Sequence, residues 1–179
     1  MLNEKRIKEA ESNVKSYLSE GLLKKQTNQT AKKMHIENSN LSLETAQKLL
    51  SLENNSYKPY LWIIVCSYYS MFYIANAVLL QLGYKVEKKI SHKVTSDALI
   101  VYVRNKLKKE LLSEYEDIKE TALELISSKT DSLFESFDLE RDKRSIFQYQ
   151  MEEEIKKGKA LTSLQRAKIF VFEMKKLLD

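Results

Sequence analysis

The residues best suited to chemistry lie in one late segment of the chain. Arg141, Arg144 and Gln148 are spaced i, i+3 and i+7, so on a helix they share one face, with Lys143 to its side. Two guanidinium groups on one face can bind a phosphate, because each presents a planar fork of donors. Gln148 and Tyr149 can add a hydrogen bond or a stacking surface for an exposed base. This pattern predicts a site for RNA or for a nucleotide.

The same segment also allows a structural interpretation. Glu140, Asp142 and neighbouring acids can neutralise the arginines in an ion network between helices, with Tyr149 packed in the core. The sequence leaves both interpretations open, since it does not show whether this helix face meets solvent or another helix.

Other catalytic apparatus is sparse. The two histidines, His35 and His92, are far apart and lack metal-ligand spacing, and no glycine-rich phosphate loop, paired-cysteine motif or HExxH motif is present. We therefore expect neither a metal nor a cofactor. His92 follows Ser91 at an expected helix start, where it would either transfer protons or bond a neighbouring carbonyl. Cys66 is the only cysteine, which fits a reducing cytoplasm.

The element that must organise the fold is an uncharged run over residues 59–84, in a chain of which 31% is charged. Such a run is either a membrane span or a helix buried on all sides. It contains serine, tyrosine, asparagine and glutamine side chains, whose hydrogen bonds lipid cannot supply. We interpret it as the central helix of a bundle, outside any membrane, with Tyr68, Tyr69 and Phe72 in the core or at a dimer interface.

Composition favours an all-α fold. Three glycines and one proline are too few for a sandwich or barrel of many short strands, and good helix formers dominate. We expect an up-and-down bundle of four to five helices over residues 41–179, preceded by a helical extension over residues 1–40. The net charge of +5 permits an acidic partner, and no signal peptide is visible, so we expect a cytoplasmic protein.

Helix boundaries follow from caps and apolar spacing. Gly21 and Gly83 are expected to end helices, and Ser42 and Ser91 to cap the starts of others. A charged linker is expected over residues 152–159. The other expected helices cover residues 3–23, 114–127, about 130–149 and 162–178.

Two stretches resemble the HEPN domain family. The first is the Tyr-Tyr-Ser-Met-Phe segment within residues 67–80, followed by Gly83 and the Ser91–His92 pair. The second is residues 140–149, which resembles the family's late helix with its R-x-x-A-D-Y-like pattern. The last helix, with Ala160, Ala167 and Phe170, fits the family's C-terminal pattern. The resemblance covers about residues 41–178.

The resemblance implies a helical bundle that often forms homodimers. Many members bind or act on RNA, frequently beside a minimal nucleotidyltransferase partner in toxin–antitoxin or defence modules. Ribonuclease members use an R-x4-6-H motif on the late helix. Here the positions expected to hold histidine are Phe147, Gln148, Tyr149 or Gln150, so the imidazole expected to exchange protons is missing.

The sequence therefore predicts a non-catalytic HEPN-like protein that binds RNA or a nucleotide, or acts as the partner of a nucleotidyltransferase. One alternative is a metal-independent ribonuclease with an altered site that uses Arg144, Tyr149 and His92. A second is a purely structural, dimeric interaction module.

Overall fold

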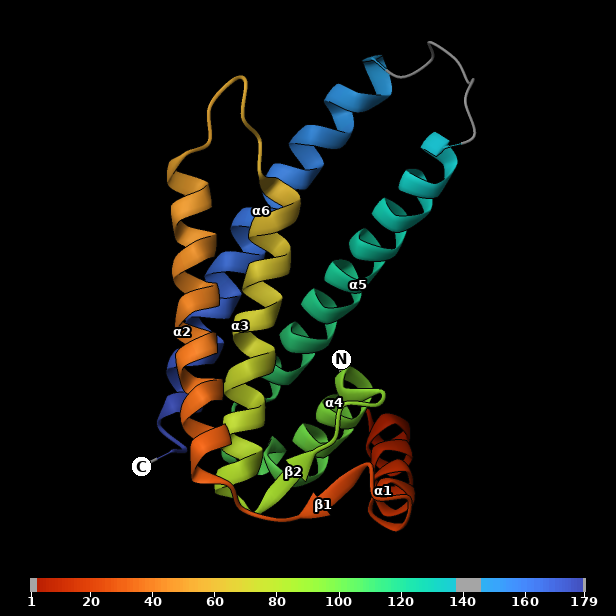
Figure 1. Cartoon of the computed structure of the whole chain (residues 1–179), viewed down its shortest axis with the longest axis vertical. Helices are drawn as coiled ribbons and strands as arrows, with labels where there is room; N and C mark the ends of the chain where they lie inside the picture. Colours follow the sequence, from red (N-terminus) through yellow and green to blue (C-terminus); the bar gives the residue numbers. More distant parts are fainter. Residues whose placement is uncertain (1–2, 138–145, 179) are drawn as a thin grey trace.

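The computed structural model describes residues 3–137 and 146–178, without the side chains of Lys109, 128–137 and 146–155. Within these residues the chain forms six α-helices packed as a bundle, together with a two-stranded antiparallel sheet (Figure 1). The all-α helical bundle predicted from the composition is confirmed.

The elements follow one another along the chain with short connections. A single 3₁₀ turn, Arg104–Lys106, links the fourth and fifth helices. The helices and strands are α1 (Glu4–Ser19), β1 (Leu23–Lys25), α2 (Gln29–Ser51), α3 (Tyr60–Gln81), β2 (Tyr84–Val86), α4 (Ser91–Tyr102), α5 (Lys109–Phe137) and α6 (Ile146–Lys175).

α3 is the centre of the bundle, and α2, α4, α5 and α6 pack around it. Its sequence is long and apolar enough to cross a membrane, but 78% of that apolar window is buried inside the protein. Tyr68 is fully buried and Phe72 is 8% exposed, while Tyr69 is partly buried against the same core. The three residues thus belong to the core or its edge.

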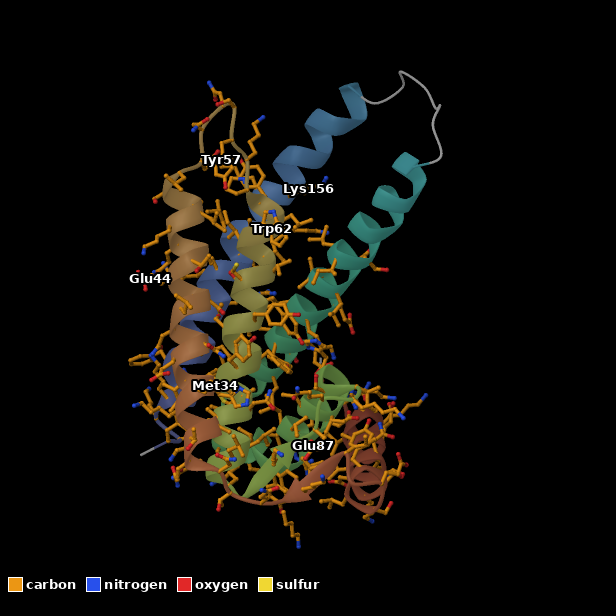
Figure 2. The ribbon with its side chains drawn as sticks, in the orientation of Figure 1. Met34, Glu44, Tyr57, Trp62, Glu87 and Lys156 are labelled. Atoms are coloured by element: carbon orange, nitrogen blue, oxygen red, sulfur yellow. The ribbon has the colours of Figure 1, made fainter. Side chains whose placement is uncertain are left out.

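The short sheet ties the N-terminal helix to the bundle. Gly21 ends the turn after α1 with φ +71°, and Gly83 follows α3 with φ +86°, a left-handed conformation that glycine adopts without a side-chain clash. The chain can then turn at both points, so that Leu23 of β1 pairs with Val86 of β2. Glu87, which directly follows β2 and is labelled in Figure 2, forms an ion pair at 3.1 Å with Lys24 of β1 and another at 3.1 Å with Lys85 of β2.

Two predicted helix starts are wrong. α2 begins at Gln29, capped by the Asn28 side chain, which accepts from the Ala31 N–H at 2.8 Å; Ser42 lies in its interior. The boundary expected at residue 40 therefore falls within one continuous helix. At α4 the capping position is Ile90, one residue before the expected Ser91.

The predicted breaks in the last third are also wrong. α5 continues through residues 128–130, where a break between two helices was expected, and the expected charged linker over residues 152–159 lies inside α6. The second of those expected helices, about residues 130–149, includes residues 138–145, which lie outside the described residues. The lysines and glutamates of that linker are good helix formers, so the helix continues through them. Helices α5 and α6 diverge toward the segment 138–145 that joins them (Figure 1).

Candidate functional site

His92, one residue into α4, lies against the aromatic face of α3. Its Nδ1 is 2.7 Å from the hydroxyl of Tyr68, and its ring centroid is 4.6 Å from that of Phe72 and 5.9 Å from that of Tyr69. These α3 residues are spaced so that successive turns present them toward the same side chain. The structure therefore places His92, a candidate site residue, against the three residues that the sequence assigned to the core or a dimer interface.

The contact with Tyr68 favours one tautomer of His92. Burial raises the pKa of Tyr68, so its hydroxyl stays protonated at neutral pH. Its other polar neighbour is the Tyr115 hydroxyl, whose interaction lowers the pKa of Tyr68 and raises that of Tyr115, as expected if Tyr115 donates to Tyr68. The Tyr68 proton is then available to Nδ1. The neutral imidazole then holds its own proton on Nε2.

The charge state of His92 is set by its surroundings. Burial lowers its pKa, and the nearby Lys119 ammonium lowers it further, because both disfavour a second positive charge. The half-buried imidazole is therefore neutral near pH 7 and offers an Nε2–H donor. In this state it can hydrogen-bond an anion, but Nε2 has no free lone pair with which to abstract a proton.

A polar cluster lies one turn further along α4. The Ser96 hydroxyl donates to Glu116 Oε1, and Lys119 donates to Ser96 Oγ at 3.1 Å and to Glu116 Oε2 at 2.7 Å. The Lys119 side chain is only 13% exposed, so its ammonium is held in place by these two partners. Its positive charge is neutralised by Glu116 at close range.

A buried carboxylate, Asp97, joins α4 to α1. Its Oδ1 is 2.6 Å from Nη1 of Arg6, and its Oδ2 accepts from Tyr17 at 2.9 Å and from Asn13 at 3.0 Å. Asp97 is fully buried, so these partners replace the water it would otherwise need.

The two polar clusters form one electrically balanced network. Arg6 Nη2 lies 4.0 Å from Glu116, which connects the Asp97 cluster to the Lys119 cluster. Two cations then face two carboxylates, so the network as a whole has no surplus charge. Its arrangement holds α1, α4 and α5 together beside His92.

The loop before His92 contains an unfavourable backbone conformation. Ile90 has φ +47°, a left-handed conformation that a β-branched side chain rarely adopts. Its side chain is 48% exposed, so little burial offsets the unfavourable backbone. The backbone here is held by its neighbours, with Lys93 and Val94 donating to the Ile90 carbonyl, and it places His92 against α3.

The predicted phosphate-binding residues cannot be compared with the structure. Arg141, Lys143 and Arg144 lie outside the described residues. Gln148 and Tyr149 belong to α6, but their side chains lie outside the description. The expectation that His92 bonds a neighbouring carbonyl is wrong, since its partner is the Tyr68 hydroxyl.

Sequence reasoning missed the ionic part of the site. Asp97 stands as the only charged residue within the apolar stretch 94–103 of α4, and such a lone acid is a usable signal for a buried, partnered carboxylate. Lys119 and Glu116 had no such signal, because α5 carries charged residues on several sides.

No group of three or more histidine, cysteine or acidic side chains that could hold a metal ion occurs in the part of the chain that the structure describes. Comparison of the chain with models of protein families, with curated proteins and with solved structures finds no match. The resemblance to the HEPN family therefore rests on the residues of this sequence alone.

Proposed function

We propose that the chain is a HEPN-like cytoplasmic protein that binds RNA or a nucleotide without cleaving it, or that serves as the partner of a minimal nucleotidyltransferase in a toxin–antitoxin or defence-type module. One observation supports binding over cleavage. The Tyr68 hydroxyl lies 2.7 Å from Nδ1 of His92, and when it donates there the imidazole proton is on Nε2. Burial and Lys119 lower the pKa of the ring and favour its neutral form. This is the form of a hydrogen-bond donor to phosphate, whereas a general base needs a free nitrogen lone pair.

The positive charge for such a ligand comes from the sequence segment that joins α5 to α6. Arg141, Lys143 and Arg144 lie within four residues of one another there. Phosphate contacts of this kind are electrostatic and release condensed counterions, so the affinity for RNA should depend strongly on salt.

The decisive experiment is binding of a fluorescein-labelled single-stranded RNA across a series of salt concentrations. Arg144→Ala should lower the affinity and reduce the slope of log affinity against log salt by roughly 0.7. Arg144→Lys should restore the slope better than the affinity, because it keeps the charge but loses the guanidinium fork. The matched control is Arg166→Ala on α6, where Arg166 pairs with Glu114 at 3.5 Å and with Asp117 at 3.6 Å.

Two results would reject the proposal. RNA cleavage in the presence of a chelator, abolished by Arg144→Ala, would establish the ribonuclease alternative, and His92→Gln and Tyr149→Phe would then test the other two residues. A chain without RNA affinity at low salt, in which Arg144→Ala only lowers the free energy of unfolding, would support the structural module.

We further propose a homodimer. Most of α3 is already covered by the other helices, so the partner surface would be a different one from the aromatic face of α3. Sedimentation at micromolar concentration tests this, and a monomer there would reject it. The proposed nucleotidyltransferase partnership is tested through the gene neighbourhood. A small nucleotidyltransferase encoded beside this chain could be purified and tested for direct binding.

A further inference from the structure

A groove lies between the N-terminal half of α2 and the C-terminal end of α6, well away from His92. It encloses about 520 Å³, within the range of small-molecule sites. Figure 2 labels Met34, which lies in this half of α2, two residues after Lys32. The groove is lined by Lys32, Ile36, Phe172, Lys175, Lys176 and Leu178.

The groove has a positive surplus. Lys32 donates to the neutral amide of Gln81 at 2.7 Å, so its charge is not neutralised there, and Lys175 has no partner among the described residues. Lys176 pairs with Glu173, an acid on the same helix, at 2.7 Å. The first turn of α2, which adjoins Lys32, contains no acid to offset the positive end of the helix dipole. The C-terminal end of α6, which forms the other wall, carries the negative end of its own dipole. The case for an anion therefore rests on Lys32 and Lys175, which pair with no carboxylate among the described residues.

An aromatic ring stands in the same groove. Phe172 is 62% exposed, although a phenyl ring in water is unfavourable, and Lys176 Nζ lies 4.5 Å from its centroid. Half-buried Ile36 and Leu178 supply an apolar floor beside it. A planar, apolar group of a ligand could cover this ring while its anionic part reached the lysines.

We infer that this groove binds a nucleotide, with the base on Phe172 and the phosphate between Lys32 and Lys175. Proteins that bind single strands combine these elements, a cationic groove and an aromatic platform on which a base stacks. The inference rests on the proposed function and deepens it, because it names a second site at which a nucleotide would bind. Where RNA is the ligand, the groove is a contact separate from residues 141–144.

The test measures two probes on the full chain: adenosine monophosphate by calorimetry, and a labelled single-stranded oligoadenylate by fluorescence anisotropy. Phe172→Ala should lower affinity by roughly five- to a hundred-fold, the range for loss of one stacked base, and Phe172→Trp should retain it. Lys32→Ala and Lys175→Ala should each reduce the salt slope for the oligonucleotide by roughly 0.7. Ribose 5-phosphate, which lacks the base, should bind more weakly and be insensitive to Phe172→Ala.

The chain offers matched controls. Lys33→Ala removes a neighbouring lysine that faces Glu37 at 3.9 Å outside the groove, and Ile169→Ala removes a 43% exposed apolar side chain from the same helix as Phe172. If the groove variants weaken the binding of adenosine monophosphate, the ligand is a free nucleotide. If they weaken only the binding of the oligonucleotide, the ligand is a nucleic-acid strand.

Three results would overturn the inference. Affinities for both probes could be unchanged in the groove variants, or could fall equally in the controls. Groove variants could instead change the oligomeric state in sedimentation, which would make the groove a contact between copies of the chain. The proposed function is judged separately, because Arg144→Ala leaves every lining residue of the groove in place.

Discussion

The Tyr68 hydroxyl and Nδ1 of His92 lie 2.7 Å apart, and this contact joins the centre of α3 to the first turn of α4. The fully buried ring of Tyr115 on α5 stands 6.0 Å from that of Tyr68, and in turn stacks on Phe170 of α6 at 5.4 Å. The imidazole therefore contacts the first of three rings that lie next to one another in turn, Tyr68 of α3, Tyr115 of α5 and Phe170 of α6. Its position depends on the packing of the whole bundle.

The first prediction concerns Tyr68→Phe. This change keeps the ring but leaves Nδ1 of His92 without its donor, so the neutral imidazole loses a stabilising hydrogen bond. We expect the pKa of His92 to rise toward its ordinary value of about 6.5, and the free energy of unfolding to fall by about 1 kcal/mol. An NMR titration of the His92 ring protons measures the pKa, and urea unfolding measures the free energy of unfolding.

Tyr69→Phe is the matched control, since the Tyr69 ring also contacts His92 but its hydroxyl makes no hydrogen bond to it. An unchanged His92 pKa in Tyr68→Phe, or an equal rise in Tyr69→Phe, would show that the hydroxyl contact does not control the imidazole.

The second prediction concerns Asp97→Asn at the junction of α1 and α4. The amide keeps the shape of the side chain but cannot pair with Arg6, and its NH₂ group would face a donor. We expect the free energy of unfolding to fall by about 1.5–3 kcal/mol, the range for hydrogen bonds to charged groups. Hydrogen exchange should also accelerate in α1 more than in α3.

The comparison variant is Asp117→Asn on α5. Its carboxylate is 64% exposed and lies 3.6 Å from Arg166, so the loss should stay within about 0.5 kcal/mol. Equal losses in the two variants, or exchange in α1 that does not respond to Asp97→Asn, would mean that the carboxylate does not anchor α1.

The buried central helix was predictable because its evidence is local. The absence of charge over residues 59–84 indicates burial, and Gly83 supplies the left-handed residue that ends the helix. Some of the polar side chains in the run find partners within the bundle: Asn76 donates to the Phe72 carbonyl at 2.8 Å and contacts Thr95 of α4. The buried Ser67 hydroxyl is an exception, since it has no hydrogen-bond partner among the described residues.

Helix starts at serine and threonine were less predictable, because these side chains also fit the interior of a helix. Thr45 donates to the Leu41 carbonyl at 2.8 Å, and Thr121 donates to that of Asp117 at 2.9 Å. Buried Ser39 instead donates to the Ser70 carbonyl on α3. Serine and threonine therefore also occur in helix interiors, and Ser42, which lies inside α2, gave a false boundary.

The partners within the site depend on contacts between distant parts of the chain. Tyr17 and Asp97 are 80 residues apart, and Tyr68 and His92 are 24 apart. Residue type identified His92 as a candidate, but only the packing of α4 against α3 reveals the hydroxyl that sets its tautomer.

The third prediction contrasts two phenylalanines. Phe72 is 8% exposed and contacts His92, so Phe72→Ala should lower the free energy of unfolding by about 3–5 kcal/mol through the cavity it leaves. Phe172 is 62% exposed, so Phe172→Ala should change it by no more than about 0.5 kcal/mol. Urea unfolding of both variants measures the difference, and similar losses at the two positions would contradict the burial of Phe72.

The fourth prediction concerns pH. Burial lowers the pKa of both His35 and His92 in the folded chain, while in the unfolded chain both titrate near about 6.5. Below that pH the unfolded chain binds more protons than the folded one, so the free energy of unfolding should fall on acidification. Carboxylates whose pKa is lowered on folding, such as Glu53, lose their contribution only below about pH 4.5. Urea unfolding between about pH 7.5 and 5 should therefore show a slope that His35→Gln and His92→Gln each reduce. A slope that persists in the double variant would assign it to other groups.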